Sequence, residues 1–220
     1  MNPHYLFGAC LTAALFAFTG CGSGQRPVVP ASSLSSTLQN GAYSGDLLYV
    51  SHHTSRSNDL SVYTYPGRVF VMGIPGVQYA TEMCTDSHGN IFVRDTAGLQ
   101  EFAHGGTAPI NTLSVDGPCA YDPTTNDLAV LGNDRVYLYA NESGTPQVYG
   151  PYSNRTFLRG TFDNSGNLYI IYEPEGSSWH LLKFSSGTFT PIELNQSLPN
   201  TNEYTIQFDG RNLVLNCFNI

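Results

Sequence analysis

Short apolar runs recur along the chain, and a polar turn sequence comes directly before each of them. The runs return roughly every forty residues along the sequence. Gly, Asn and Asp before the runs suit tight turns between short strands. The repeated peptides are SGDLLYV at 44–50, DSHGNIFV at 86–93, DPTTNDLAV at 122–130, DNSGNLYII at 163–171 and DGRNLVLN at 209–216.

Each repeat has room for four short strands. In the unit that begins at Val77, the strand segments read VQYATEMCT, NIFVRD, LQEFA and INTLSV. The same order returns at 117–150 and at 156–194, with three strand segments before these units and two after them. Radial repetition of a small antiparallel sheet explains such a period. We therefore predict an all-β fold over residues 44–220, a β-propeller of four-stranded antiparallel blades with three complete blades and a partial blade at each end.

The composition agrees with a β-rich, turn-rich protein. The chain holds 14 Tyr, 12 Phe, 22 Gly and 13 Pro, and only 12% of its residues are charged. Its formal net charge is −8, and its nine Lys and Arg residues form no cluster that would attract a polyanion. We expect no nucleic-acid partner. The sequence also lacks a Gly-x-Ser-x-Gly elbow, a phosphate loop and a Cys-x-x-Cys pair, so it predicts no catalytic residue, no cofactor and no metal.

The peptide DSHGNIFVRDTAGLQEF at 86–102 resembles the repeat of NHL-type and related six-bladed propellers, in which D-x-x-G-N forms the turn between the two inner strands. DNSGNLYII matches this repeat pattern too, whereas DPTTNDLAV has one extra turn residue and DGRNLVLN is one residue short. The Arg-Ile segment typical of NHL third strands is missing. The resemblance covers residues 45–220 and implies a ring of blades, but it implies no substrate.

Six blades need more strands than these segments supply. We therefore expect the sequence to be the N-terminal portion of a longer, truncated propeller. The alternative is a four-bladed ring in which YTIQF at 204–208 completes the first blade. That arrangement would leave the last segment, NLVLNCFNI, as an exposed edge, which proteins usually avoid.

The N-terminus predicts export and membrane attachment. An apolar stretch, LTAALFAF at 11–18, is too short to span a bilayer but suits the core of a signal peptide. It leads into FTGC, which resembles the bacterial lipobox, and the resemblance implies that residues 1–20 are removed and that Cys21 carries lipid. Phe18 in place of Leu and the absence of Lys or Arg before the stretch depart from that pattern. An ordinary cleaved signal peptide or a buried apolar helix is the alternative.

Residues 21–43 are rich in Gly, Ser and Pro, the composition of a flexible tether. We expect this tether to hold the folded domain at the bacterial cell envelope, on the extracytoplasmic side of a membrane. Outside the signal and the lipid site, three cysteines remain, at 84, 119 and 217. Cys84 and Cys119 fall on neighbouring inner strands, two and three residues before the repeat Asp, so their side chains should point to opposite faces. We expect buried thiols in preference to a disulfide.

The repeat aspartates are expected to be structural. Asp86, Asp122, Asp163 and Asp209 head tight turns, where a carboxylate accepts hydrogen bonds from backbone N–H groups. Recurring calcium ligands are the alternative, but no unit has the dense acidic spacing of a calcium loop.

Candidates for a binding face emerge when the units are compared position by position. Glu82 and Arg159 are charges on otherwise uncharged inner strands, and we expect each to hold a local partner or to await a ligand. His52, Asp95 and Glu173 follow second strands and should line the same face. The alternative is a solvated rim with one satisfied ion pair. The other histidines after the tether, at 53, 88, 104 and 180, show no metal-ligand spacing, so we expect them at the surface.

The function that these observations favour is a membrane-anchored envelope lipoprotein whose propeller is a binding or scaffold domain. Its expected partners are the membrane, through the lipid anchor, and an unknown protein, peptide or glycan. A propeller enzyme, such as a metal-dependent lactonase or a lyase, is the alternative. Part of its site would then lie outside this sequence.

Overall fold

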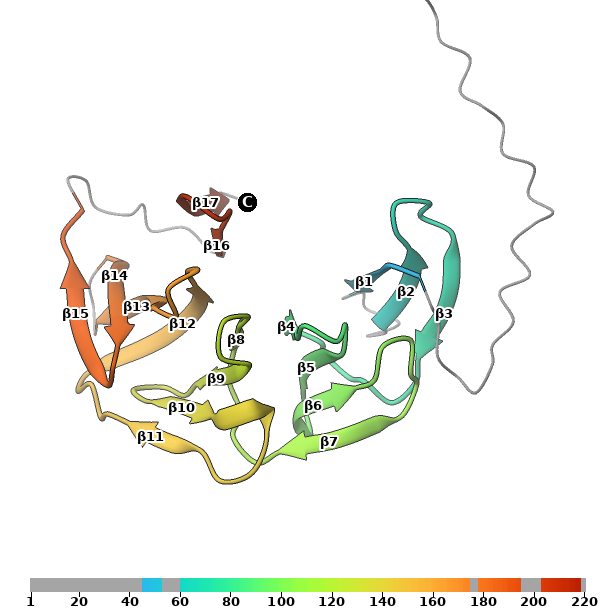
Figure 1. Cartoon of the computed structure of the whole chain (residues 1–220), viewed down its shortest axis with the longest axis horizontal. Helices are drawn as coiled ribbons and strands as arrows, with labels where there is room; N and C mark the ends of the chain where they lie inside the picture. Colours follow the sequence, from blue (N-terminus) through green and yellow to red (C-terminus); the bar gives the residue numbers. More distant parts are fainter. Residues whose placement is uncertain (1–44, 53–59, 175–177, 195–202, 219–220) are drawn as a thin grey trace, which may run out of the picture. The chain divides into compact units, whose positions relative to one another are not determined.

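The computed structural model describes residues 45–52, 60–174, 178–194 and 203–218. These residues form five antiparallel sheets that follow one another along the chain (Figure 1). Cys21, the tether and His53 lie outside the described residues. In the part of the chain that the structure describes, no helix is long and apolar enough to cross a membrane.

The first sheet has three strands and the second has four, each paired with the next along the chain. The strands of the first sheet are β1 (Leu47–Ser51), β2 (Leu60–Thr64) and β3 (Phe70–Ile74). Those of the second are β4 (Glu82–Thr85), β5 (Ile91–Asp95), β6 (Gly98–Phe102) and β7 (Pro109–Leu113).

Two further four-stranded sheets and one two-stranded sheet follow. The third sheet contains β8 (Cys119–Asp122), β9 (Asp127–Leu131), β10 (Val136–Tyr139), a 3₁₀ turn η1 (Ala140–Glu142) and β11 (Gln147–Tyr149). The fourth contains β12 (Arg155–Phe162), β13 (Leu168–Pro174), β14 (His180–Ser185) and β15 (Thr188–Ile192), and the fifth β16 (Glu203–Phe208) and β17 (Leu213–Phe218). The prediction of an all-β fold with antiparallel four-stranded sheets is confirmed.

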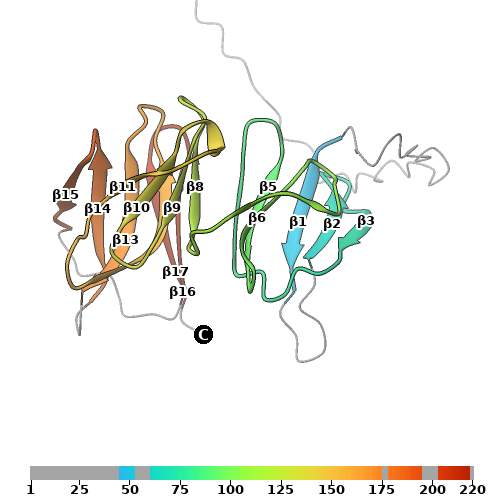
Figure 2. The ribbon, with the colours of Figure 1, turned by 90° about the horizontal axis from the view of Figure 1, so that it is seen from below.

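The first strands of successive sheets lie next to one another, as predicted: β4 contacts β8, β8 contacts β12, and β12 contacts β16. In Figure 2, which is turned by 90°, most of the strands run up and down the view. β16 pairs with β17 and not with the first sheet, so the pairing that a four-bladed ring would need is not the one observed among the described strands.

The cores lie between the faces of consecutive sheets. Along β5, Ile91 and Val93 pack with apolar residues of the first sheet, whereas Phe92 packs with those of the third. Along β9, Leu128 packs toward the second sheet and Ala129 toward the fourth. Successive side chains of a strand point to opposite faces. The second strands therefore read as continuous apolar runs because both of their faces are buried.

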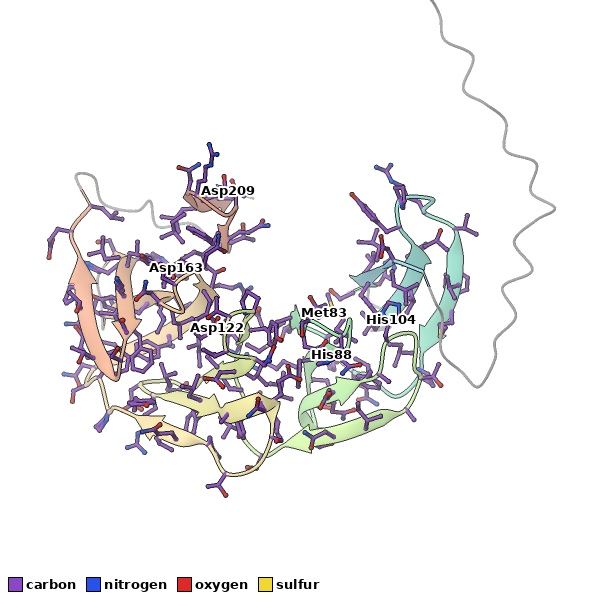
Figure 3. All side chains as sticks on the ribbon, in the orientation of Figure 1. Met83, His88, His104, Asp122, Asp163 and Asp209 are labelled. Atoms are coloured by element: carbon purple, nitrogen blue, oxygen red, sulfur yellow. A yellow bond between two sulfur atoms is a disulfide. The ribbon has the colours of Figure 1, made fainter. Side chains whose placement is uncertain are left out.

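The repeat aspartates build the turns between first and second strands. The carboxylate of Asp86 accepts hydrogen bonds from the backbone N–H groups of His88 and Asn90, both at 2.8 Å. Asp163 accepts the equivalent bonds from Ser165 and Asn167, at 2.8 and 2.9 Å. Asp122 and Asp209 do the same in their own turns. Figure 3 labels three of these aspartates. The prediction of a structural turn role is confirmed.

The prediction of two free buried thiols is wrong, because Cys84 and Cys119 form a disulfide that joins β4 to β8, with their Cα atoms 5.8 Å apart. The offset of one residue predicts that the two thiols point to opposite faces of their strands. The two strands belong to different sheets, however, and these sheets pack face to face. A side chain on the forward face of one sheet therefore meets a side chain on the rear face of the next.

Candidate functional site

A polar groove lies where the third sheet meets the fourth. It has a volume of about 550 Å³, which is within the usual range for small-ligand sites. The β9–β10 loop forms one wall, and the start of β12 and the end of β13 form the other. The lining residues are Asn133, Asp134, Asn154, Arg155, Thr156, Glu173 and Pro174.

Backbone hydrogen bonds hold the two walls together. The N–H of Phe157 donates to the carbonyl of Asn133, and the N–H of Tyr152 donates to the carbonyl of Asp134, both at 2.8 Å. The β9–β10 loop is thereby attached directly to the segment that enters β12. The side chains of Asn133 and Asp134 are consequently presented by an ordered backbone.

Arg155 is the central cation of the groove. Its guanidinium carbon lies 4.5 Å from the centre of the Tyr152 ring and 4.7 Å from the centre of the Tyr172 ring. Such contacts with the faces of two aromatic rings restrain a guanidinium and stabilise its charge. Burial raises the pKa of Tyr172, and the charge of Arg155 opposes that rise. His180 stacks on Tyr172, with the ring centres 5.5 Å apart.

The groove offers donors and acceptors of both signs. Arg155 and the amides of Asn133 and Asn154 can donate hydrogen bonds, and the carboxylates of Asp134 and Glu173 can accept them. Planar amide, carboxylate and guanidinium groups can each form two parallel hydrogen bonds with the hydroxyl and amide groups of a polar ligand. The chemistry available here is therefore recognition of a polar ligand.

The residues predicted for the binding face are placed in different surroundings. Glu173 lines the groove, whereas Asp95 is buried, 8% exposed, and accepts a hydrogen bond from the backbone N–H of Ala97 at 2.7 Å. His52 is exposed beyond the end of β1. The structure therefore does not gather these three residues around one point.

Glu82 and Arg159 form an ion pair with each other, which corrects the expectation that each would hold a separate local partner. β4 and β12 both lie beside β8, so one strand separates the strands that carry the two charges. Pro118, just before β8, takes the equivalent position in the sheet between them. It has no charge, so it does not compete with Glu82 or Arg159 for an ion pair. The long Arg159 side chain spans the intervening strand. The pair matches the alternative of a rim with one satisfied ion pair.

His104 is not a simple surface residue, contrary to the prediction. Its Nδ1 lies 3.1 Å from the carbonyl oxygen of Gly89, and its Nε2 lies 2.9 Å from that of Gly45. The ring thus links the β4–β5 turn to the segment that leads into β1. Figure 3 labels His104 together with His88, which belongs to the same sheet.

Comparing the repeat units along the sequence identified Glu173 but none of the other residues that line the groove. Asn133, Asp134 and Asn154 lie in loops without a repeated spacing, and Arg155 is the first residue of β12. A short-range signal was available nonetheless. Tyr152 and Arg155 are three residues apart, and an aromatic–basic pair next to a polar loop is typical of a stacked guanidinium.

The sheets and their order define the class of the protein, an all-β fold of antiparallel four-stranded sheets of the β-propeller type. No protein-family model and no curated protein matches the sequence. Solved structures that resemble it include the following two. A eukaryotic initiation factor has a TM-score of 0.46 and 10% identity, with 80% of this chain and 47% of that chain covered. The N-terminal domain of Nup159 has a TM-score of 0.45 and 12% identity, with 78% and 58% covered. This chain thus spans about half the length of the chains that it matches.

Proposed function

We propose that this protein is an envelope lipoprotein, anchored through Cys21, whose propeller-type domain binds a polar ligand in the groove around Arg155 and Glu173. The observation that carries the proposal is the groove itself. It is a polar groove of about 550 Å³, and its Arg155 guanidinium lies against Tyr152 and Tyr172, two rings at the edge of the apolar core between the third and fourth sheets. A protein, peptide or glycan segment with hydroxyl and amide groups fits its donors and acceptors.

Two observations support the extracytoplasmic location in this proposal. The lipobox-like FTGC and the polar tether support a lipid anchor before the domain. The disulfide between Cys84 and Cys119 suits an oxidising compartment, because cytosolic thiols are kept reduced.

Binding is tested by capture of envelope components on the purified full-length protein. Arg155→Ala and Glu173→Gln each remove one polar group from the groove, and we expect each to weaken capture by roughly tenfold, about 1.4 kcal/mol. Arg211→Ala is the matched control, because Arg211 is an exposed arginine in the turn between β16 and β17. Equal capture by all three variants and the wild type would place binding elsewhere.

Anchoring is tested separately by growth with labelled palmitate. Wild-type protein should take up the label, and Cys21→Ala should not. Equal label on both proteins, or none on the wild type, would refute the anchor and leave the groove experiment unaffected.

A further inference from the structure

Three side chains with metal-binding atoms converge at the end of β10 that lies opposite the groove. Asp86 and His88 belong to the β4–β5 turn of the second sheet, and Glu142 is the last residue of η1 in the third. One carboxylate oxygen from each acid and one imidazole nitrogen all lie within 4.8 Å of one another. The groove borders the β9–β10 loop, which precedes β10, whereas η1 follows β10.

The local structure holds the Asp86 side chain in place and leaves the His88 side chain adjustable. The Asp86 side chain is fully buried, and its turn hydrogen bonds hold it in place. Glu142 follows a sharp bend, since both Asn141 and Glu142 have positive φ angles, 48° and 61°. The His88 side chain is 74% exposed, and its Nδ1 is 3.7 Å from the Asp86 carboxylate. It can therefore rotate toward the two acids without disturbing a core.

The two acids are close enough to oppose each other's charge. Burial first, and then the neighbouring carboxylates of Asp86 and Glu101, together raise the pKa of Glu142 to about 7, while a hydrogen bond with the Tyr121 hydroxyl opposes them. Burial also raises the pKa of Glu101. A cation bound between Asp86 and Glu142 would offset the repulsion between their two carboxylates.

We propose that Asp86, His88 and Glu142 bind one divalent transition-metal ion of the zinc type, joining the second sheet to the third. Ligand atoms about 2.1 Å from a tetrahedral ion lie about 3.4 Å apart, so closing from 4.8 Å requires only a small side-chain rotation. The imidazole nitrogen distinguishes this set from a group of carboxylates alone. Nitrogen donors favour zinc and similar ions, whereas calcium and magnesium prefer oxygen ligands only.

The proposal is tested by zinc titration of the full-length protein, purified without a polyhistidine tag, with a chromophoric chelator as competitor. The wild type should bind one equivalent of zinc. His88→Ala and Glu142→Gln should each weaken binding at least tenfold. His180→Ala should stay within twofold of the wild type, because His180 lies on β14, outside the cluster.

Thermal unfolding without metal checks that each variant is folded, and added zinc should raise the wild-type melting temperature but not that of Glu142→Gln. No zinc binding by the wild type would overturn the proposal. Equal binding by wild type, His88→Ala and Glu142→Gln would do so too. Calcium binding as tight as zinc binding would show that the imidazole is not a ligand and would also refute the site as proposed.

Discussion

The disulfide between Cys84 and Cys119 should be the largest single contributor to stability among the features that link two sheets. It connects the first strands of the second and third sheets, whose remaining contacts are apolar packing and hydrogen bonds. Replacing both cysteines by alanine removes the crosslink and leaves two small apolar side chains in the same positions. We expect the double variant to fold, with a lower free energy of unfolding.

The magnitude follows from the length of chain that the bond closes. The two cysteines are 35 residues apart, and closing a loop of that size removes about 13 cal/mol/K of entropy from the unfolded chain, about 3.8 kcal/mol at 25 °C. With a urea dependence of about 2 kcal/mol per molar for a domain of this size, the unfolding midpoint should fall by about 2 M.

Urea unfolding followed by tyrosine and tryptophan fluorescence measures this shift. Wild-type protein in dithiothreitol is the internal control. Reduction of its disulfide should lower its unfolding midpoint to that of the double variant. Dithiothreitol should not change the midpoint of the double variant itself. If the oxidised wild type and the variant unfold at the same urea concentration, the loop-closure argument is refuted. Two reactive thiols at these positions in oxidised protein would refute the bond itself.

Three further predictions concern single features of the fold. Asp163→Ala should lower the free energy of unfolding by about 1–2 kcal/mol, since it removes the carboxylate that accepts two backbone N–H groups in its turn; Asp163→Asn, which keeps an acceptor, should recover most of the loss in the same urea assay. A double-mutant cycle with Glu82→Gln and Arg159→Gln should give a coupling energy of about 0.5–1 kcal/mol, because the Arg159 side chain is 36% exposed; a value near zero would mean that the ion pair contributes nothing. In a chelator, stability should fall as the pH rises from about 4.5 to about 7, because folded Glu142 has a raised pKa and keeps its proton longer than the unfolded chain does; Glu142→Gln should flatten this dependence, which solvent screening limits to about 1 kcal/mol.

The strands could be predicted because their determinants are local. The turn beginning at Asp163 needs only its own carboxylate and the N–H groups of the next few residues, so the sequence pattern and the hydrogen bonds agree. The continuous apolar run in β9 likewise reports that both of its faces are buried. The same peptide pattern predicts the element and its position in the sheet.

Contacts between sheets could not be predicted from the same pattern. The Glu82–Arg159 pair and the Cys84–Cys119 bond depend on how two sheets are packed, which no residue spacing within one repeat encodes. The groove is a similar case, because Asn133 and Glu173 are brought together by the packing of the third sheet on the fourth. Glu142 comes to lie beside Asp86 for the same reason.

The burial of second strands on both faces also determines how a disturbance spreads through the molecule. Phe92 and Val93 are adjacent on β5, yet they belong to the cores on either side of the second sheet. Local opening of one core therefore loosens a strand that the neighbouring core shares, and cooperativity passes from each sheet to the next along the chain. Amide hydrogen exchange should accordingly show β5, β9 and β13 opening together. The cores on both sides of each of these strands should determine its protection.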